Sequence, residues 1–259
     1  AHLPLPPELP PAVNMMPYPI FLGAYIPLAV GCALADKLNG RKHVSLAFVG
    51  EGSTSEGDFH DGLNFAGVLE SPCVIVVQNN QWSISVPASR QTAAATFAQK
   101  AVAYGLPHER VDGNDIFAIY ATVKKAVDRA RSGGGATLIE AVTYRILDHN
   151  SADSSAVYRT EDEAEYWKTL DPVERFEKYL LNQGVLDQAT KTALEARAEK
   201  RLREEIDRGR AVPPTSPDDM FLHHLQGEPG WSVKHQRDEL ACELAGGNPF
   251  LDMTGEGVQ

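Results

Sequence analysis

The chain has 259 residues, of which 43% are hydrophobic and 23% are charged, and its formal net charge is −11. This length suits one large domain, or one domain with an appendage. No apolar run reaches the roughly 20 residues of a membrane span, and no basic stripe stands out, which argues against membrane or nucleic-acid partners. The three cysteines lack metal-type spacing, and two of them are expected to be buried free thiols, which suits a reducing compartment.

The first part of the chain divides into a connector, a helix and a strand. Residues 1–21 are rich in proline, which predicts an extended connector. Residues 22–39 carry small apolar side chains at helical spacing, and Asn39-Gly40 is a typical helix stop. Residues 42–49 then predict a buried strand.

A second helix and strand follow. Ser53 or Ser55 is predicted to cap a helix that runs to about Leu69. Residues 73–78 are β-branched and apolar almost without interruption, as in a parallel sheet covered on both faces. The helix contains Gly62 and Gly67, which suit close helix packing, either between subunits or inside one chain.

The pattern of strand and helix continues to Arg145. We predict a helix at residues 91–104 and a short strand at 106–111. An amphipathic helix is predicted at 116–132 and a further strand at 137–145. This alternation predicts an α/β fold with a doubly wound, mostly parallel sheet, whose ligands lie beyond the carboxyl ends of the strands. The α/β domain is placed at residues 22–160 and ends in a polar, mobile loop at 146–160.

The remaining residues, 161–259, predict a helical C-terminal region that packs on the α/β domain or on a partner subunit. Residues 161–210 are highly charged and rich in helix-forming residues, and a second helical piece is expected near 217–226. Residues 230–259 are weakly patterned.

Two short polar motifs follow neighbouring apolar strands. Gly50-Glu51-Gly52 ends the first, and Asn79-Asn80 ends the second. Alone, each motif is most often a simple turn. Together, Glu51, Asn80 and the main-chain carbonyl of Trp82 offer three hard oxygens, while Mg2+ takes about six, commonly including phosphate and water oxygens. The pair therefore indicates a site for a divalent cation with a diphosphate.

This segment resembles the thiamine diphosphate motif, an acidic residue between two glycines followed some distance later by two asparagines. Residues 50–85 resemble more closely the alpha subunit of the thiamine-dependent component of 2-oxo acid dehydrogenase complexes. Residues 111–115, 143–145 and the loop from His149 to Arg159 also match sequences of that family. The likeness runs from about Leu22 to the C-terminal helices and covers roughly the last two-thirds of a typical member.

The resemblance implies thiamine diphosphate and magnesium (Mg2+) as cofactors. It implies metal binding by Glu51, Asn80 and the carbonyl of Trp82. It places Leu22 beside the aminopyrimidine ring, and Arg145 at the mouth of the site. The residues that it places in contact with the cofactor are Leu22, Gly50, Glu51, Gly52, Ser53, Asn80, Trp82, Arg145 and His149.

The resemblance further implies an oxidoreductase that decarboxylates a 2-oxo acid and transfers the acyl group to a lipoyl group. Arg145 and His149 would be its catalytic residues, with His149 as proton donor or acceptor in the acyl transfer. The resemblance slightly favours branched-chain 2-oxo acids over pyruvate as the substrate. The implied partners are a beta subunit in an α2β2 heterotetramer and the lipoyl-bearing acyltransferase core. The implied location is the bacterial cytoplasm, or the mitochondrial matrix if the source is eukaryotic.

Some positions depart from the family pattern. The commonest family form has Asp where this chain has Glu51, and an arginine where it has Gln78. Asn150 stands where some relatives carry a regulatory serine, so no kinase control is predicted there. Two alternatives stay open: a non-catalytic α/β scaffold subunit, and an acetoin-type or transketolase-type enzyme with the same cofactor. His60 and His108 are read as structural.

Overall fold

A computed structural model describes residues 15–16, 21–213, 216–222, 227 and 229–246. The chain forms two compact units, Ala1–Leu186 and Asp187–Gln259, which are described separately. The predicted connector at residues 1–21 lies almost entirely outside the described residues. Within the described part of the chain, every helix is too short or too polar to cross a bilayer. The domain limits predicted from the sequence stay a prediction.

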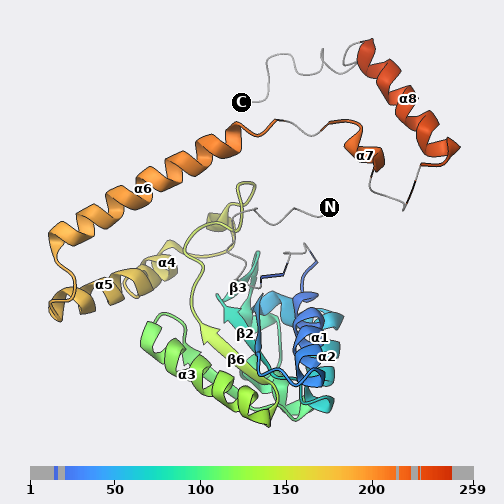
Figure 1. Cartoon of the computed structure of the whole chain (residues 1–259). Coiled ribbons are helices and arrows are strands. Elements are labelled where there is room, and N and C mark those ends of the chain that lie inside the picture. Colours follow the sequence, from blue (N-terminus) through green and yellow to red (C-terminus); the bar gives the residue numbers. More distant parts are fainter. Residues whose placement is uncertain (1–14, 17–20, 214–215, 223–226, 228, 247–259) are drawn as a thin grey trace. The chain divides into compact units, whose positions relative to one another are not determined.

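The first unit alternates strands and helices along the chain (Figure 1). Its elements are α1 (Tyr25–Leu38), β1 (Ser45–Gly50), η1 (Glu51–Ser55), α2 (Gly57–Val68), β2 (Cys73–Asn79), β3 (Trp82–Ser83), β4 (Val86–Pro87), η2 (Ala88–Arg90), η3 (Ala98–Tyr104), β5 (His108–Asp112), α3 (Ile116–Arg129), η4 (Ala130–Gly134), β6 (Thr137–Val142), η5 (Ser155–Val157), α4 (Glu161–Lys168) and α5 (Pro172–Asn182). The second unit contains α6 (Gln188–Arg210), α7 (Asp219–Leu222) and α8 (Trp231–Ala245).

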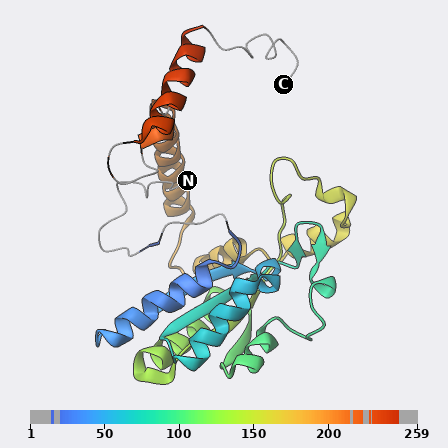
Figure 2. The same cartoon turned by 90° about the vertical axis from the view of Figure 1, so that its right-hand side faces the viewer.

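The main sheet has the strand order β1-β2-β6-β5, and every neighbouring pair is parallel. Helices α1 and α2 lie side by side on one face, and α3 covers the other (Figures 1 and 2). This arrangement confirms the predicted doubly wound α/β fold. Strands β3 and β4 form a separate antiparallel pair.

The core follows from the apolar run in β2. Its residues 73–77 are all buried, and successive side chains point to opposite faces of the sheet. Ile75 and Val77 pack with Phe59 and Leu63 of α2 in one cluster. Val74 and Val76 lie in a second cluster, beneath α3. A strand buried on both faces needs an uninterrupted apolar sequence, which is why its pattern predicted a parallel sheet.

Two predicted helix starts were wrong. Neither Ser53 nor Ser55 caps α2: residues 51–55 form the short helix η1, and extended backbone at Glu56 separates it from α2. Residues 91–97 are not helical either, because side chains there bond to the main chain in place of helical bonds. Thr92 Oγ1 accepts from Ala94 N at 3.2 Å, for example.

The cysteine prediction needs correction, whereas the C-terminal helices α7 and α8 lie in the region that was predicted to be helical. Residues 231–245 form helix α8 although they lack a clear amphipathic pattern; their helix-forming composition is enough. The piece predicted at 217–226 is the short helix α7, and 223–226 lie outside the described residues. Cys73 is buried, and burial raises the pKa of its thiol to about 12, whereas Cys32 and Cys242 are exposed. Two buried cysteines were expected, and one is found.

The two helical glycines of α2 pack inside this chain. A Cβ at Gly62 would lie 2.6 Å from Cγ2 of Ile26 in α1, and a Cβ at Gly67 would lie 2.4 Å from the carbonyl oxygen of Tyr104. Both distances are far below van der Waals contact. Gly62 and Gly67 therefore allow close packing within this chain, which is one of the two alternatives predicted from the sequence.

Substituting Gly67 with alanine is expected to lower the free energy of unfolding by about 1–3 kcal/mol, because the clash is with a main-chain atom that cannot rotate away. Gly31 in α1 is the matched control, since nothing lies within 4 Å of its Cβ position. Gly31→Ala should stabilise the chain by up to about 1 kcal/mol through helix propensity. Urea unfolding of both variants checks this, and equal effects would contradict it.

Candidate cofactor and metal site

The ends of three parallel strands bring the predicted motifs together. In the sheet register, Gly50 pairs with Gln78, and Asn79 pairs with Val142. The pairing continues past the strands, because Arg145 N donates to the carbonyl of Asn80 at 3.1 Å. The glycine motif, the asparagine motif and the segment ending at Arg145 therefore share one edge of the sheet, as the sequence predicted.

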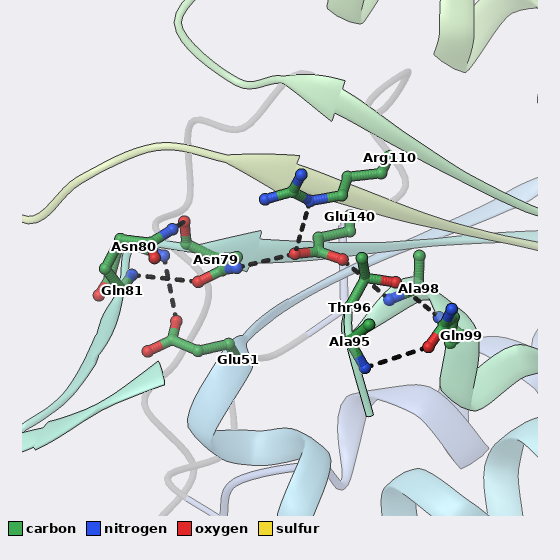
Figure 3. Close-up of polar contacts among 10 residues, drawn as sticks. All are labelled: Glu51, Asn79, Asn80, Gln81, Ala95, Thr96, Ala98, Gln99, Arg110 and Glu140. Atoms are coloured by element: carbon green, nitrogen blue, oxygen red, sulfur yellow. Dashed lines mark hydrogen bonds and ion pairs between the residues drawn. The ribbon is translucent and has the colours of Figure 1, made fainter. Parts of the chain in front are cut away.

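Glu51 is the buried acidic group of this edge, and the residue is 1% exposed. Its Oε2 accepts from the main-chain nitrogen of Asn80 at 3.1 Å, which joins the two motifs directly (Figure 3). Its Oε1 accepts from Nε2 of Gln91 at 3.3 Å. A buried carboxylate needs such donors, because leaving it unpaired would be costly.

The other two predicted metal ligands lie on the turn after β2. Asn80 Oδ1 accepts from Trp82 N at 3.1 Å, and the carbonyl of Trp82 accepts from Nη1 of Arg145 at 3.1 Å. Each of these oxygens has two lone pairs, so one hydrogen bond leaves acceptor capacity. The turn thus supplies neutral oxygens beside the Glu51 carboxylate.

The two glycines beside Glu51 have different environments. A Cβ at Gly52 would lie 2.3 Å from Oγ of Ser83, so this position requires glycine for close approach. At Gly50, nothing lies within 4 Å of the Cβ position, and the backbone has φ −74° and ψ 161°, which any residue adopts. The open space at Gly50 suits a ligand.

A chain of hydrogen bonds links Arg145 to the loop that carries His149. Arg145 Nη2 donates to the carbonyl of Ile84 and to the hydroxyl of Tyr158, each at 2.7 Å. The Tyr158 hydroxyl donates to Oδ2 of Asp153 at 2.5 Å, and that oxygen also accepts from His149 N at 2.8 Å. The main chain of His149 is thereby tied to the site.

These contacts perturb the titratable groups of the loop. The hydrogen bond from Tyr158 and the main-chain N–H of His149 lower the pKa of Asp153 below its ordinary value. Burial raises the pKa of Tyr158, and its bond to Asp153 raises it further. Arg145 opposes that rise, because its positive charge favours the phenolate. The loop is held by a charged network, although its backbone is mostly irregular.

Two predicted residues lie apart from these contacts. Leu22 is 57% exposed, and no contact described in the structure joins it to Glu51 or Asn80. Ser53 is buried within η1.

Sequence reasoning missed Gln91, Lys100 and Glu140. Glu140 had a visible signal: an acidic residue inside an apolar strand, where burial is costly unless partners are present.

Lys100 supports the turn after Glu51. Its Nζ donates to the carbonyl and to Oγ1 of Thr54, both at 2.8 Å. Thr54 Oγ1 in turn donates to the carbonyl of Glu51 at 2.7 Å. Burial lowers the pKa of Lys100, and its ammonium lies over the rings of Phe59 and Phe97. Helix η3 is thereby tied to the glycine motif.

The donor set fits Mg2+ with a diphosphate. Within the described part of the chain, His, Cys, Asp and Glu side chains form no metal cluster of three or more, so a metal here depends on one carboxylate with amide and carbonyl oxygens. Hard oxygen ligands of this kind suit Mg2+, which keeps phosphate and water oxygens in its shell. Arg145 Nε and Gln91 Oε1 are buried without a hydrogen-bond partner among the described residues, which leaves polar capacity at the site.

The chain belongs to the dehydrogenase E1 component family, whose sequence pattern matches residues 8–218. This match confirms the resemblance drawn from the glycine and asparagine motifs. The 3-methyl-2-oxobutanoate dehydrogenase subunit alpha of Mycobacterium tuberculosis is 46% identical over 231 residues, which cover 88% of this chain and 62% of that protein.

Two further relatives are pyruvate dehydrogenase E1 component alpha subunits. The protein from Acholeplasma laidlawii is 44% identical over 176 residues, 68% of this chain and 51% of its own length. The protein from Staphylococcus aureus is 45% identical over 179 residues, 69% of this chain and 48% of its own length. The chain thus spans between 48% and 62% of these relatives.

Proposed function

We propose that this chain is the alpha-subunit part of the decarboxylating component of a 2-oxo acid dehydrogenase complex, dependent on thiamine diphosphate and Mg2+. The observation that carries the proposal is the contact between the Glu51 carboxylate and Asn80 N at the joint ends of β1 and β2. It brings a charged oxygen beside the amide and carbonyl oxygens of the next turn. That combination suits a hard cation that is shared with phosphate oxygens.

In this proposal Glu51, Asn80 and the carbonyl of Trp82 would bind Mg2+. Gly50, Gly52 and Ser53 would hold the diphosphate, and the space beside Gly50 is open. Leu22 would contact the aminopyrimidine ring. When bound, thiamine diphosphate supplies the electron sink that the loss of carbon dioxide from a 2-oxo acid requires.

Arg145 and His149 act at the mouth of the site. Arg145 holds the Trp82 carbonyl and the Tyr158 hydroxyl, so it fixes the loop against the turn that carries the metal ligands. Its positive charge also attracts the carboxylate or phosphate of bound molecules. His149 gives or takes the proton in acyl transfer to a lipoyl group.

The substrate and the partners follow from the relatives. The branched-chain relative aligns with 88% of the chain and the two pyruvate relatives with 68–69%, which supports branched-chain 2-oxo acids ahead of pyruvate. The proposed partners are a beta subunit, in an α2β2 heterotetramer, and a lipoyl-bearing acyltransferase core. The bacterial sources of the relatives support a cytoplasmic location.

The test uses the chain co-expressed with its beta subunit. Calorimetric titration with thiamine diphosphate should show binding that requires Mg2+. Assays with 3-methyl-2-oxobutanoate and with pyruvate should show decarboxylation, faster with the former. Binding without any dependence on Mg2+ would overturn the metal site. Cofactor binding without decarboxylation of either acid would favour the alternative of a non-catalytic scaffold subunit. The exposed Gln78, which stands where the family often has an arginine, favours that alternative.

A further inference from the structure

Glu140 is a buried carboxylate that the proposed function does not use. It lies in the middle of β6, opposite Val77 of β2, and is 1% exposed. Its Oε1 accepts from Nδ2 of Asn79 at 2.8 Å, and its Oε2 accepts from Ala98 N at 2.9 Å (Figure 3). Arg110, whose side chain is half-exposed, approaches Oε1 at 3.4 Å.

The first oxygen of Glu140 fixes the turn that carries the proposed metal ligands. Asn79 uses its amide nitrogen on Glu140 and its Oδ1 on Gln81 N, at 3.1 Å. Gln81 has φ 73°, a conformation that is costly for a residue with a side chain and persists when contacts hold it. The bond between Asn79 and Glu140 therefore sets the turn in which Asn80 N reaches Glu51.

The second oxygen of Glu140 fixes the opposite side of the site. It holds Ala98 N at the start of η3, and η3 carries Lys100. Lys100 bonds to Thr54, whose hydroxyl donates to the carbonyl of Glu51. The two oxygens of one carboxylate thus connect to the asparagine turn and to the glycine turn.

We propose that Glu140 is a positioning residue for Mg2+: it fixes the Glu51 turn and the Asn80 turn relative to each other. This inference rests on the proposed function, because it concerns the same metal site. Glu140 does not touch the metal. It acts through Asn79 and Ala98, each of which has one hydrogen bond to it.

The direct test is Glu140→Gln, which keeps the size of the side chain. Glutamine has one oxygen and one NH2 group, so in either orientation the NH2 faces a donor, Asn79 Nδ2 or Ala98 N. The complex of this chain and its beta subunit is titrated with Mg2+ at saturating thiamine diphosphate. The affinity for Mg2+ should fall by about 10- to 100-fold, the usual loss when a residue that orients a metal ligand is changed. Asn79→Asp should also weaken binding, because two carboxylates then face each other.

The decisive variant reverses the pair. In Asn79→Asp with Glu140→Gln, the amide of Gln at 140 donates to Asp at 79, its oxygen still accepts from Ala98 N, and Asp still accepts from Gln81 N. The bond between positions 79 and 140 is restored with donor and acceptor exchanged, the bonds from Ala98 N and Gln81 N keep their direction, and only the contact from Arg110 is lost. The affinity for Mg2+ should recover most of what either single variant loses. A role of Glu140 in fold stability alone predicts that folded Glu140→Gln binds Mg2+ as tightly as the unchanged chain.

The control is Arg110→Gln, which changes the half-exposed partner of Glu140 and leaves Asn79 and Ala98 in place. It should bind Mg2+ as the unchanged chain does. Wild-type affinity in Glu140→Gln would overturn the inference while the proposed function stands, whereas an unchanged chain that fails to bind Mg2+ would overturn the proposed function itself. If Glu140→Gln does not fold, the reversed pair decides: tight Mg2+ binding supports the inference, and a folded protein that binds weakly overturns it.

Discussion

Substituting Glu51 with glutamine is expected to abolish Mg2+-dependent binding of thiamine diphosphate. Glu51 is the charged member of the proposed ligand set, and its carboxylate is buried at the joint ends of two strands. A neutral amide keeps the shape but removes the charge that a divalent cation needs. The loss of affinity should exceed the about 10- to 100-fold that a supporting contact typically contributes. Titration of the complex with the beta subunit, with and without Mg2+, measures it.

Glu56→Gln is the matched control for this experiment. Glu56 follows η1 closely in sequence and undergoes the same chemical change, but its side chain is exposed. It should bind the cofactor with unchanged dependence on Mg2+. If both variants lost cofactor affinity to a similar extent, the loss would come from the negative charge of this region and not from metal binding by the Glu51 side chain. Thermal unfolding of both variants separates a lost ligand from a lost fold.

The fold and half of the site could be predicted because they depend on local patterns. An uninterrupted apolar run at β2 predicts a buried parallel strand, and parallel strands end at the same edge. The meeting of Glu51 and Asn80, which lies 29 positions later in the sequence, follows from that geometry, because α2 and β2 return the chain to the same end of the sheet.

The rest of the site depends on contacts that spacing does not encode. Glu140 lies 61 positions after Asn79, and their bond depends on the register of β6 against β2. Lys100, which reaches Thr54, follows residues 91–97, where bonds such as that from Ala94 N to Thr92 Oγ1 stand in place of a helix. In such segments, hydrogen bonds from side chains to the main chain are an alternative to helical hydrogen bonds, and the sequence pattern does not show which of the two forms.

The two ends of the site differ in how firmly the chain holds them. Glu51 and Asn79 are buried and bonded on several sides, whereas the loop with His149 is largely exposed and is held by hydrogen bonds of the side chains of Asp148, Asp153, Tyr158 and Arg159. Exposed segments with few buried contacts open at low free energy. We therefore expect cofactor binding to depend on the rigid sheet edge, and the later proton transfer on the loop.

His149→Ala is expected to slow acyl transfer to a lipoyl group by about 10²- to 10⁴-fold, the usual contribution of a positioned acid or base. Cofactor affinity should fall much less than the rate of acyl transfer, because the contact that ties this residue to Asp153 uses its main-chain nitrogen, which alanine retains. The loop therefore keeps its anchor while the imidazole is lost. Single-turnover assays that follow decarboxylation and lipoyl acylation separately distinguish the two steps.

His108→Ala provides the matched control, since His108 is an exposed histidine of β5 that pairs with Leu138 of the neighbouring strand through the main chain. It should leave both steps unchanged. Equal slowing of decarboxylation and acylation in His149→Ala would place the residue in the first step instead of the second. Unchanged acylation would remove His149 from the chemistry altogether, and would leave Arg145 as the charged group at the mouth of the site.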